Sequence, residues 1–231
     1  MGEDEVAAIV LAAGRSARMG GDDKLWAELG GVPVIGHSLR ALVATAGVTT
    51  LLIVGPGERH AALRALADEA VDGAEVDVRC VEGGERRQDS VAAGLAAAPE
   101  AGWYLVHDGA RPLVTAELAA AVLAAAREHG AAAPAVPVTD TLKRVDAAER
   151  VVETVDRASM RAVQTPQAFE GGLLREAHAT MRGDATDDAS MVEALGRSVV
   201  LVPGDPANIK VTRPVDLVVA RALLEERRRG S

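Results

Sequence analysis

The amino-acid sequence predicts a single α/β domain in which helices cover both faces of a mostly parallel, twisted β-sheet. Short apolar runs alternate along the 231 residues with stretches rich in Ala and Leu that have a helical period. Such an alternation requires crossover connections, which join parallel strands and place helices on both faces of the sheet. No internal repeat and no linker rich in Pro, Gly or Ser interrupts the chain, so we expect one domain over residues 1–231.

The expected strands and helices alternate along the whole chain. Apolar runs typical of strands begin at Val6, Thr49, Ala74, Trp103, Ala131 and Ser198. Between them, helical patterns occupy Ile35–Thr45, Arg59–Ala70, Ser90–Ala98, Ala116–His129 and Gly172–Met181. Pro214 is expected to open the last helix, because a proline suits the first helical position.

One polar segment departs from this alternation. Thr139 to Arg157 forms two short strand-like stretches around a turn at Asp146–Glu149, which is the pattern of a β-hairpin. Its content of Thr, Lys, Arg and Asp is too polar for two central strands of a sheet. A projecting hairpin would leave open strand edges, which proteins usually pair or cover. We therefore expect a second copy of the chain to cover it.

Composition and charge exclude several classes of protein. A formal net charge of -9 argues against nucleic-acid binding, which needs a basic surface. Cys80 is the only cysteine, so no disulfide framework and no thiolate metal cage can form. No apolar run is long enough for a membrane span, and the N-terminal residues lack a signal-peptide pattern. We therefore expect a cytoplasmic protein without membrane or nucleic-acid partners.

The loop after the first expected strand combines small residues with cations. Ala12, Ala13 and Gly14 precede Arg18 and Lys24. The loop matches neither the G-x-G-x-x-G pattern nor a P-loop, but small residues let a ligand approach backbone N–H groups, which can hold phosphate oxygens. Two interpretations stay open from this stretch alone: cations that neutralise a polyphosphate, or a solvated loop with scattered charges.

Ligands of open α/β sheets bind beyond the carboxyl ends of the strands, so the residues after other strands are candidates too. Gly83 and Gly84 precede a helix that is expected to start near Arg87 or Gln88. This turn could bind an anion or a nucleobase, or could be an ordinary connection. Asp108 ends the fourth strand, where a carboxylate can hold Mg²⁺ against phosphates or can cap a turn.

Other polar residues have simpler interpretations when each is taken alone. We expect His107 to be a packed or hydrogen-bonded histidine, and the spacing of the five histidines excludes a zinc site. Thr186 or Asp187 is expected to cap a helix. Lys210 is expected in a short strand.

Taken in order, eight segments closely resemble the 2-C-methyl-D-erythritol 4-phosphate cytidylyltransferase family. They are "LAAGRSARMG…K", "GGERRQDSV", "VHDGARP", "DTLKR", "DR", "TPQAF", "TDDAS" and "NIKVTRP". The resemblance covers the chain from about Val6 to Leu224. It implies a Rossmann-like nucleotidyltransferase sheet with a projecting β-arm at about residues 138–158, and a homodimer in which the two arms are exchanged.

The resemblance also implies a reaction. CMP would pass from CTP to 2-C-methyl-D-erythritol 4-phosphate by in-line attack of the acceptor phosphate on the α-phosphorus, with pyrophosphate leaving. The attacking oxygen is already ionised, so the reaction needs no Ser or Cys nucleophile and no strong base. Positioning and charge neutralisation would suffice, as in other phosphoryl-type transfers.

Individual residues acquire roles from the same resemblance. The cations on the triphosphate and the transition state would be Arg18, Lys24 and Lys210, and Asp108 would hold Mg²⁺ or another divalent cation. The residues around the cytidine would be Ala12, Ala13, Gly14, Gly84, Glu85 and Ser90. Further substrate-binding residues would be Arg111, Thr165 and Thr186, together with Thr141 and Arg157, which would reach the partner's site from the arm.

The chain departs from the family pattern at two positions of the first loop. Ser16 stands where glycine is usual and Asp23 where proline is usual, so the exact path of this loop stays open. Two alternative functions also remain. One is a cytidylyltransferase for another polyol phosphate, such as ribitol 5-phosphate. The other is a non-catalytic nucleotide-binding protein, against which the retained cations and Asp108 argue.

Overall fold

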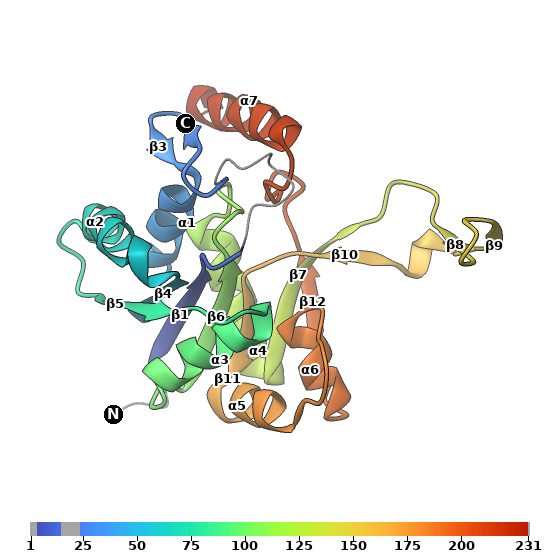
Figure 1. Cartoon of the computed structure of the whole chain (residues 1–231), viewed down its shortest axis with the longest axis horizontal. Coiled ribbons are helices and arrows are strands. Elements are labelled where there is room, and N and C mark those ends of the chain that lie inside the picture. Colours follow the sequence, from blue (N-terminus) through green and yellow to red (C-terminus); the bar gives the residue numbers. More distant parts are fainter. Residues whose placement is uncertain (1–3, 15–23, 231) are drawn as a thin grey trace.

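The computed structural model describes residues 4–14 and 24–230, and within them the main sheet has eight strands. Seven of them lie in the order β10-β7-β11-β6-β1-β4-β5, and β12 pairs with β7 (Figure 1). The strands are β1 (Val6–Leu11), β4 (Val48–Gly55), β5 (Asp77–Glu82), β6 (Trp103–Asp108), β7 (Ala131–Pro137), β10 (Arg161–Val163), β11 (Gln167–Glu170) and β12 (Val200–Pro203).

The sheet is mostly parallel, as the sequence predicts. The central strand β1 runs parallel to β4 on one side and to β6 on the other. Strands β10 and β11 were not predicted, and both run antiparallel to their neighbours. They are only three and four residues long and flank Pro166, so their stretch of sequence lacks the continuous apolar run that identifies the other strands.

Helices cover both faces of the sheet, and each of the five helical ranges expected from the sequence lies within a few residues of an observed helix. The observed helices are α1 (Val34–Val43), α2 (His60–Val71), α3 (Arg87–Ala97), α4 (Ala116–His129), α5 (Gly171–Thr180), α6 (Asp188–Ala194) and α7 (Pro214–Gly230). Among the described residues, two single 3₁₀ turns, η2 (Gly57–Arg59) and η3 (Arg157–Ser159), lie outside these helices. No helix in the described part of the chain is both long and apolar enough to cross a membrane.

The alternation of side chains along β1 divides the core into two layers. Val6, Ala8 and Val10 pack with buried residues of α1, α2 and α4. Ala7 and Ile9 point to the opposite face and pack with α3, α5 and α6. Both sets are completely buried, as expected for a strand that is covered on both faces. The sheet is therefore a rigid base for the loops at the carboxyl ends of its strands.

The last helix lies outside this layered core. Helix α7 packs over the small sheet formed by β2 (Glu28–Leu29) and β3 (Val32–Pro33). Leu29, Val34, Val211 and Ala220 form a separate buried cluster there. This cluster fixes the segment that leads into α7 beside the carboxyl end of β6, because Val211 N–H donates a 2.8 Å hydrogen bond to the Ala110 carbonyl.

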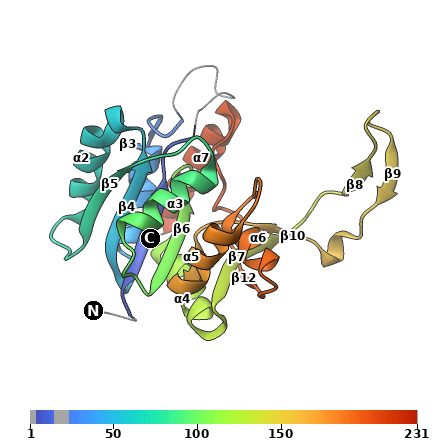
Figure 2. The ribbon, with the colours of Figure 1, turned by 60° about the horizontal axis from the view of Figure 1, so that its bottom comes forward.

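The predicted hairpin is present and projects from the body. Its strands are β8 (Lys143–Val145) and β9 (Val151–Thr154), which pair antiparallel. Figures 1 and 2 show it standing away from the main sheet in two views. Asp146 forms the turn by accepting hydrogen bonds from the Ala148 and Arg150 amides. We call residues 138–158 the arm.

Candidate functional site

A cleft of about 680 Å³ opens where the carboxyl ends of β1, β5 and β6 meet. Small residues form much of its wall, which leaves backbone groups accessible to a ligand. Its lining comprises Leu11, Ala13, Gly14, Lys24, Leu25, Pro56, Glu82, Gly83, Gly84, Glu85, Arg86, Arg87, Ser90, Asp108, Gly109, Ala110 and Lys210. We call it the first cleft.

A second cleft of about 260 Å³ adjoins the first. Its lining comprises Arg87, Asp108, Arg111, Val163, Gln164, Thr165, Gln167, Thr186, Asp187 and Lys210. The two clefts have Arg87, Asp108 and Lys210 in common. We call these three residues the junction, since any two ligands in the clefts would meet there.

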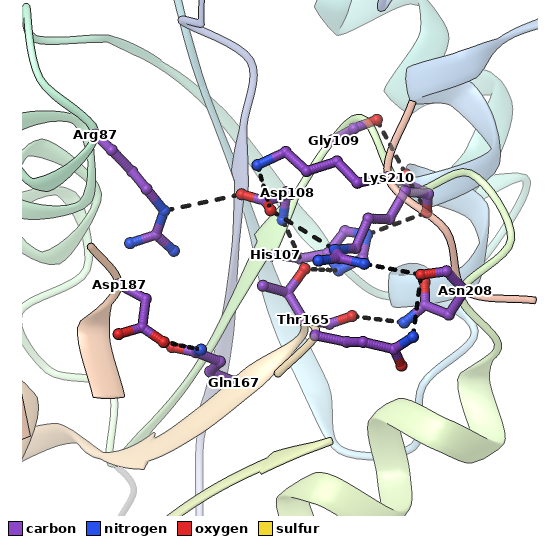
Figure 3. A network of polar contacts seen from close by, with 12 residues as sticks. Arg87, His107, Asp108, Gly109, Thr165, Gln167, Asp187, Asn208 and Lys210 are labelled. Carbon is purple, nitrogen blue, oxygen red and sulfur yellow. Dashed lines mark hydrogen bonds and ion pairs between the residues drawn. The ribbon is translucent and has the colours of Figure 1, made fainter. Parts of the chain in front are cut away.

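Asp108 occupies the centre of the junction and is surrounded by cations (Figure 3). Lys210 Nζ lies 2.8 Å from Oδ2, Arg111 Nε lies 3.7 Å from the same oxygen, and Arg87 Nε lies 3.8 Å from Oδ1. Burial alone would raise the pKa of Asp108, but the surrounding cations, Lys210 foremost, lower it to about 2. The side chain is therefore a permanent carboxylate at neutral pH.

A buried chain of hydrogen bonds fixes the backbone beneath Asp108. The Asp108 amide donates to Thr165 Oγ1 at 3.0 Å, and this hydroxyl lies 3.1 Å from His107 Nδ1. His107 Nε2 faces the Arg111 carbonyl at 3.4 Å, so Nε2 carries the proton and Nδ1 accepts from Thr165. Burial lowers the pKa of His107 to about 4, although Asp108 acts in the opposite direction. The prediction of a packed, hydrogen-bonded histidine is confirmed.

Lys210 does not lie in a strand, so that prediction is wrong. It belongs to an irregular segment between β12 and α7. Its polar neighbours bond locally instead of to a sheet: the Asn208 amide donates to the Asp205 carbonyl, and the Thr212 amide donates to Asp216. This segment turns across the end of β6, which brings the lysine to Asp108.

Asn208 ties the same segment to the second cleft (Figure 3). The side-chain amide of Asn208 donates to the Thr165 carbonyl at 2.9 Å. The backbone carbonyl of Asn208 accepts from Arg111 Nη1 at 2.8 Å. Because both contacts are largely buried, they hold Arg111 and Thr165 in fixed positions on the wall of the second cleft.

The turn between β5 and α3 packs closely against the first loop. A Cβ atom on Gly83 would lie 2.5 Å from Ala13 Cβ, and one on Gly84 would lie 2.3 Å from Asp89 Cβ. Both distances are too short for a larger residue. Ser90 Oγ accepts a hydrogen bond from the Gly84 amide at 3.1 Å, which closes the turn. Helix α3 begins at Arg87, as predicted.

The structure brings most of the predicted site residues together. Ala13, Gly14, Lys24, Gly84, Glu85, Ser90, Asp108 and Lys210 line the first cleft, and Asp108, Arg111, Thr165, Thr186 and Lys210 line the second. Ala12 is buried behind the first cleft, where its amide donates to the Val54 carbonyl. Arg18, Ser16 and Asp23 lie outside the described residues.

Two predicted residues lie on the arm and do not reach the clefts of their own chain. Thr141 is exposed, and the Arg157 guanidinium donates to the Thr139 carbonyl within the arm. Neither residue lines either cleft. Their predicted contact with substrate therefore requires the arm of a second chain.

Sequence reasoning missed Arg87 as a site residue. A cation in the first turn of a helix is unfavourable because the helix dipole is positive at that end, so this position signalled a nearby carboxylate. The Asp187 side chain caps α6 by accepting from the Ser190 amide and also accepts from Gln167 Nε2, which lines the second cleft. No sequence pattern distinguishes Gln167 from an ordinary buried amide.

The residues of the junction fit a divalent cation of the Mg²⁺ class only together with substrate phosphates. No group of three or more His, Cys, Asp or Glu side chains in the described ranges could hold a metal ion. Mg²⁺ is commonly held by one or two carboxylates together with phosphates and water. Asp108 is ionised and lines both clefts, which suits that arrangement.

Comparisons with known proteins agree with the predicted resemblance. The family model described as 2-C-methyl-D-erythritol 4-phosphate cytidylyltransferase matches residues 6–226. A protein of that name from Streptomyces coelicolor is 47% identical over 96% of this chain and 86% of its own length. One from Pelotomaculum thermopropionicum is 45% identical over 97% of this chain and 96% of its own.

Solved structures give the same result and confirm the predicted fold class. The cytidylyltransferase of this name from Thermus thermophilus aligns with a TM-score of 0.76 at 40% identity, covering 95% of this chain and 98% of that chain. A 4-diphosphocytidyl-2C-methyl-D-erythritol synthase from Anaerococcus prevotii aligns with a TM-score of 0.83 at 28% identity, covering 97% and 100%.

Proposed function

The chain belongs to the 2-C-methyl-D-erythritol 4-phosphate cytidylyltransferase family, and from this premise we propose the reaction that it catalyses. It transfers CMP from CTP to 2-C-methyl-D-erythritol 4-phosphate, which gives 4-diphosphocytidyl-2-C-methyl-D-erythritol and pyrophosphate. The observation that carries the proposal is the junction. Two clefts meet at one carboxylate and two cations, so the phosphates of two substrates can be held next to each other.

CTP binds in the first cleft. The close-packed glycines of the β5–α3 turn and the small residues of the first loop leave room for a nucleoside against the backbone. Lys24 and Lys210 line the same cleft and can neutralise the triphosphate. The predicted role of Arg18 on the triphosphate remains part of the proposal.

The acceptor phosphate binds in the second cleft. Arg111 supplies a guanidinium that suits phosphate recognition, and Thr165 and Thr186 supply hydroxyl groups for the polyol. The cleft is small and polar, in keeping with a five-carbon polyol phosphate. Lys210 can contact the acceptor phosphate and the nucleotide together because it lines both clefts.

The reaction is an in-line displacement at phosphorus. An ionised oxygen of the acceptor phosphate attacks the α-phosphorus of CTP, and the new P–O bond completes the diphosphate of the product. The bond between the α-phosphorus and the oxygen bridging to the β-phosphorus breaks, and its electron pair leaves with pyrophosphate. No proton needs to be removed from the nucleophile. The chain contributes positioning and charge neutralisation.

A divalent cation, Mg²⁺ in the first instance, is part of the proposal. Asp108 would hold it together with substrate phosphates, where it would neutralise negative charge on the triphosphate. Asp108 also pairs with Lys210 at 2.8 Å. The carboxylate therefore keeps the lysine at the junction until phosphates bind.

We also propose that the active protein is a homodimer in which each arm completes the partner's site. The arm exposes Val145, Val151 and Val152 to solvent, and their apolar surface suits burial against another chain. Thr141 and Arg157 lie on the same projecting segment. In the partner's second cleft, the planar guanidinium of Arg157 could bind the acceptor phosphate through two hydrogen bonds.

Pyrophosphate release tests the reaction. The purified protein with CTP and Mg²⁺ is expected to release pyrophosphate only when 2-C-methyl-D-erythritol 4-phosphate is added. Ribitol 5-phosphate is the matched control acceptor, because it offers the same phosphate on another polyol. Release that is faster with ribitol 5-phosphate would contradict the proposed acceptor. A lack of release with either acceptor would contradict the proposed class of reaction.

A further inference from the structure

Arg87 lies at the junction, although the sequence did not identify it as a binding residue. It projects from the first turn of α3 and lines both clefts (Figure 3). Its side chain is 26% exposed, and its Nε faces Asp108 Oδ1 at 3.8 Å. This distance is longer than a hydrogen bond, so Asp108 attracts the guanidinium without using its Nε–H group.

The other side of the guanidinium is anchored in the protein interior. Arg87 Nη1 lies 2.7 Å from Asp188 Oδ2, and Asp188 is completely buried. Asp188 Oδ1 lies 2.9 Å from His178 Nε2, whose side chain is also almost fully buried. The pair formed by Asp188 and His178 links α6 and α5 to the first turn of α3.

An isolated structural ion pair does not account for this arrangement. A buried ion pair often stabilises a protein no more than apolar residues of the same volume would, because removing both charges from water is costly. Here Asp188 and His178 together orient a third group, the guanidinium of Arg87. Asp188 fixes one edge of this guanidinium and leaves its Nε edge toward the junction. Fixing a donor before substrate binds avoids the cost of ordering it during the reaction.

We infer that Arg87 binds substrate phosphate at the junction, and that Asp188 and His178 are positioning residues that hold it there. This inference rests on the proposed function, because the phosphates are those of CTP and of the acceptor. Arg87 lines both clefts, so the phosphate that it contacts is one of the two between which the new bond forms. It therefore supports turnover more than nucleotide binding, because the cytidine and the distal phosphates contact other residues of the first cleft.

A set of single and double variants tests this inference. Arg87→Ala is expected to lower kcat by about 100-fold, a typical loss for one preorganised donor, with the Kd for CTP nearly unchanged. Asp188→Asn is expected to lower kcat by about 10-fold, as is typical when a supporting group is lost. In an Arg87→Ala background, Asp188→Asn should have no further effect on kcat, because its effect passes through Arg87.

Chemical rescue provides a readout that a purely structural role would not move. Guanidinium ions added to Arg87→Ala are expected to restore part of kcat, whereas they should not restore Asp188→Asn, which retains its arginine. The control pair is Arg64 and Asp68, which form a 2.8 Å ion pair on the surface of α2 with both side chains more than half exposed. Arg64→Ala and Asp68→Asn are expected to leave kcat unchanged. Thermal melting shows that each variant is folded at the assay temperature.

Three results would overturn the inference. Arg87→Ala with a kcat near the wild-type value would remove Arg87 from phosphate binding. A loss that guanidinium does not restore, together with weaker CTP binding, would make Arg87 a structural residue. If Asp188→Asn lowers kcat in the Arg87→Ala background by as much as it does in wild type, Asp188 does not act by positioning Arg87. If Asp188→Asn fails to fold, the rescue of Arg87→Ala by guanidinium still tests the role of Arg87. Wild-type protein that makes no product would contradict the proposed function instead.

Discussion

At the scale of single residues, the charge balance around Asp108 governs what the junction can bind. The carboxylate faces three cations, Lys210, Arg87 and Arg111, within the described residues. Arg87 is also paired with the buried Asp188, so Lys210 and Arg111 are the two positive charges that Asp108 alone balances, which leaves the junction attractive to phosphates. The ion pair with Lys210 also competes with any phosphate for the lysine, so Asp108 both positions this cation and restrains it.

The variant Asp108→Asn separates these two effects. The amide keeps the shape of the side chain but removes the charge, so Lys210 no longer has a carboxylate competing with phosphate. Without a divalent cation, we expect Asp108→Asn to bind CTP more tightly than wild type does, by about a factor of 10, the equivalent of ~1.4 kcal/mol. With Mg²⁺, we expect turnover to fall strongly. Calorimetric titration with and without a chelator, together with turnover assays, measures both.

A simple turn cap would behave differently. If Asp108→Asn melts well below wild type, keeps its turnover and binds CTP no more tightly, the side chain serves stability and not the reaction.

Asp188 makes a separate prediction about stability and pH. Burial alone would raise the pKa of Asp188, but the hydrogen bond from His178 and the charge of Arg87 lower it below its usual value. A carboxyl whose folded-state pKa is lowered adds stability above its unfolded-state pKa, and this stability is lost as the pH falls through the folded-state pKa. Asp188→Asn should therefore lower the free energy of unfolding at neutral pH by roughly 3 kcal/mol, because Arg87 loses its buried partner.

Denaturant unfolding at a series of pH values checks this prediction. The difference between wild type and Asp188→Asn should shrink as the solution becomes more acidic. Asp68→Asn is the control, since its carboxylate is exposed on α2 and should give a small difference at every pH. A difference for Asp188→Asn that is constant from neutral to strongly acidic pH would show that the charge of Asp188 does not stabilise the fold.

At the scale of the elements, the ends of β1, β5 and β6 act together through close packing. The turn after β5 meets the loop after β1 where Gly83 approaches Ala13, and the carboxyl end of β6 carries Asp108. The segment after β12 then crosses this edge and adds Lys210, fixed by the hydrogen bond from Val211 to Ala110. The site therefore depends on contacts between loops as much as on the strands.

Gly83→Ala tests the contact between two of these loops. The added Cβ would lie 2.5 Å from Ala13 Cβ, so one loop must move away from the other. Overpacking of this kind costs about 1–3 kcal/mol, and we expect the movement to weaken CTP binding and to lower the melting temperature. Gly172→Ala in α5 is the control, because its nearest neighbour is the end of the flexible Glu170 side chain. Unchanged CTP affinity in Gly83→Ala would mean that the turn does not shape the nucleotide cleft.

The sequence predicted the elements with clear periodicity and missed those without it. The long strands and helices have apolar patterns of several residues, and the hairpin has an Asp146 turn between two strand-like stretches. Strands β10 and β11 were not predicted because they depend on pairing with β7 and β6, which no local sequence pattern reveals. The prediction that Lys210 lies in a strand was wrong for the same reason, since the hydrogen bond from the Val211 amide to the Ala110 carbonyl fixes its segment.

The candidate site was predicted from motifs, and its internal geometry was not. The glycines and Asp108 could be identified by their positions after strands, and Lys210 by the family resemblance. The contact of Arg87 with Asp188 joins residues about a hundred positions apart and becomes visible only in the folded chain.

At the scale of the whole molecule, the proposed active unit is larger than one chain. The arm projects from the body (Figures 1 and 2). Its residues Thr141 and Arg157 line neither cleft of their own chain. In the proposed isologous dimer each arm would reach the partner's second cleft, and each site would then draw its first cleft from one chain and its arm from the other.

Mixed dimers test this sharing of sites. Lys24→Ala and Arg157→Ala homodimers are each expected to be poor enzymes, because every site lacks one part. After subunit exchange, a mixed dimer carries both lesions in one site and leaves the other site whole. Random pairing should then restore up to about a quarter of wild-type activity. A mixture that exchanges subunits but gains no activity would show that each chain supplies its own arm.

Phosphorus NMR of the reaction mixture shows whether the phosphates of two substrates are joined where the two clefts meet. With CTP, Mg²⁺ and 2-C-methyl-D-erythritol 4-phosphate, we expect a new pair of coupled diphosphate resonances and an equal amount of pyrophosphate. Lys210→Ala, which removes a cation common to both clefts, should form both products together at a much lower rate. Pyrophosphate accompanied by free CMP, with the acceptor phosphate resonance unchanged, would contradict the proposed transfer, because the protein would then hydrolyse CTP instead of joining CMP to an acceptor.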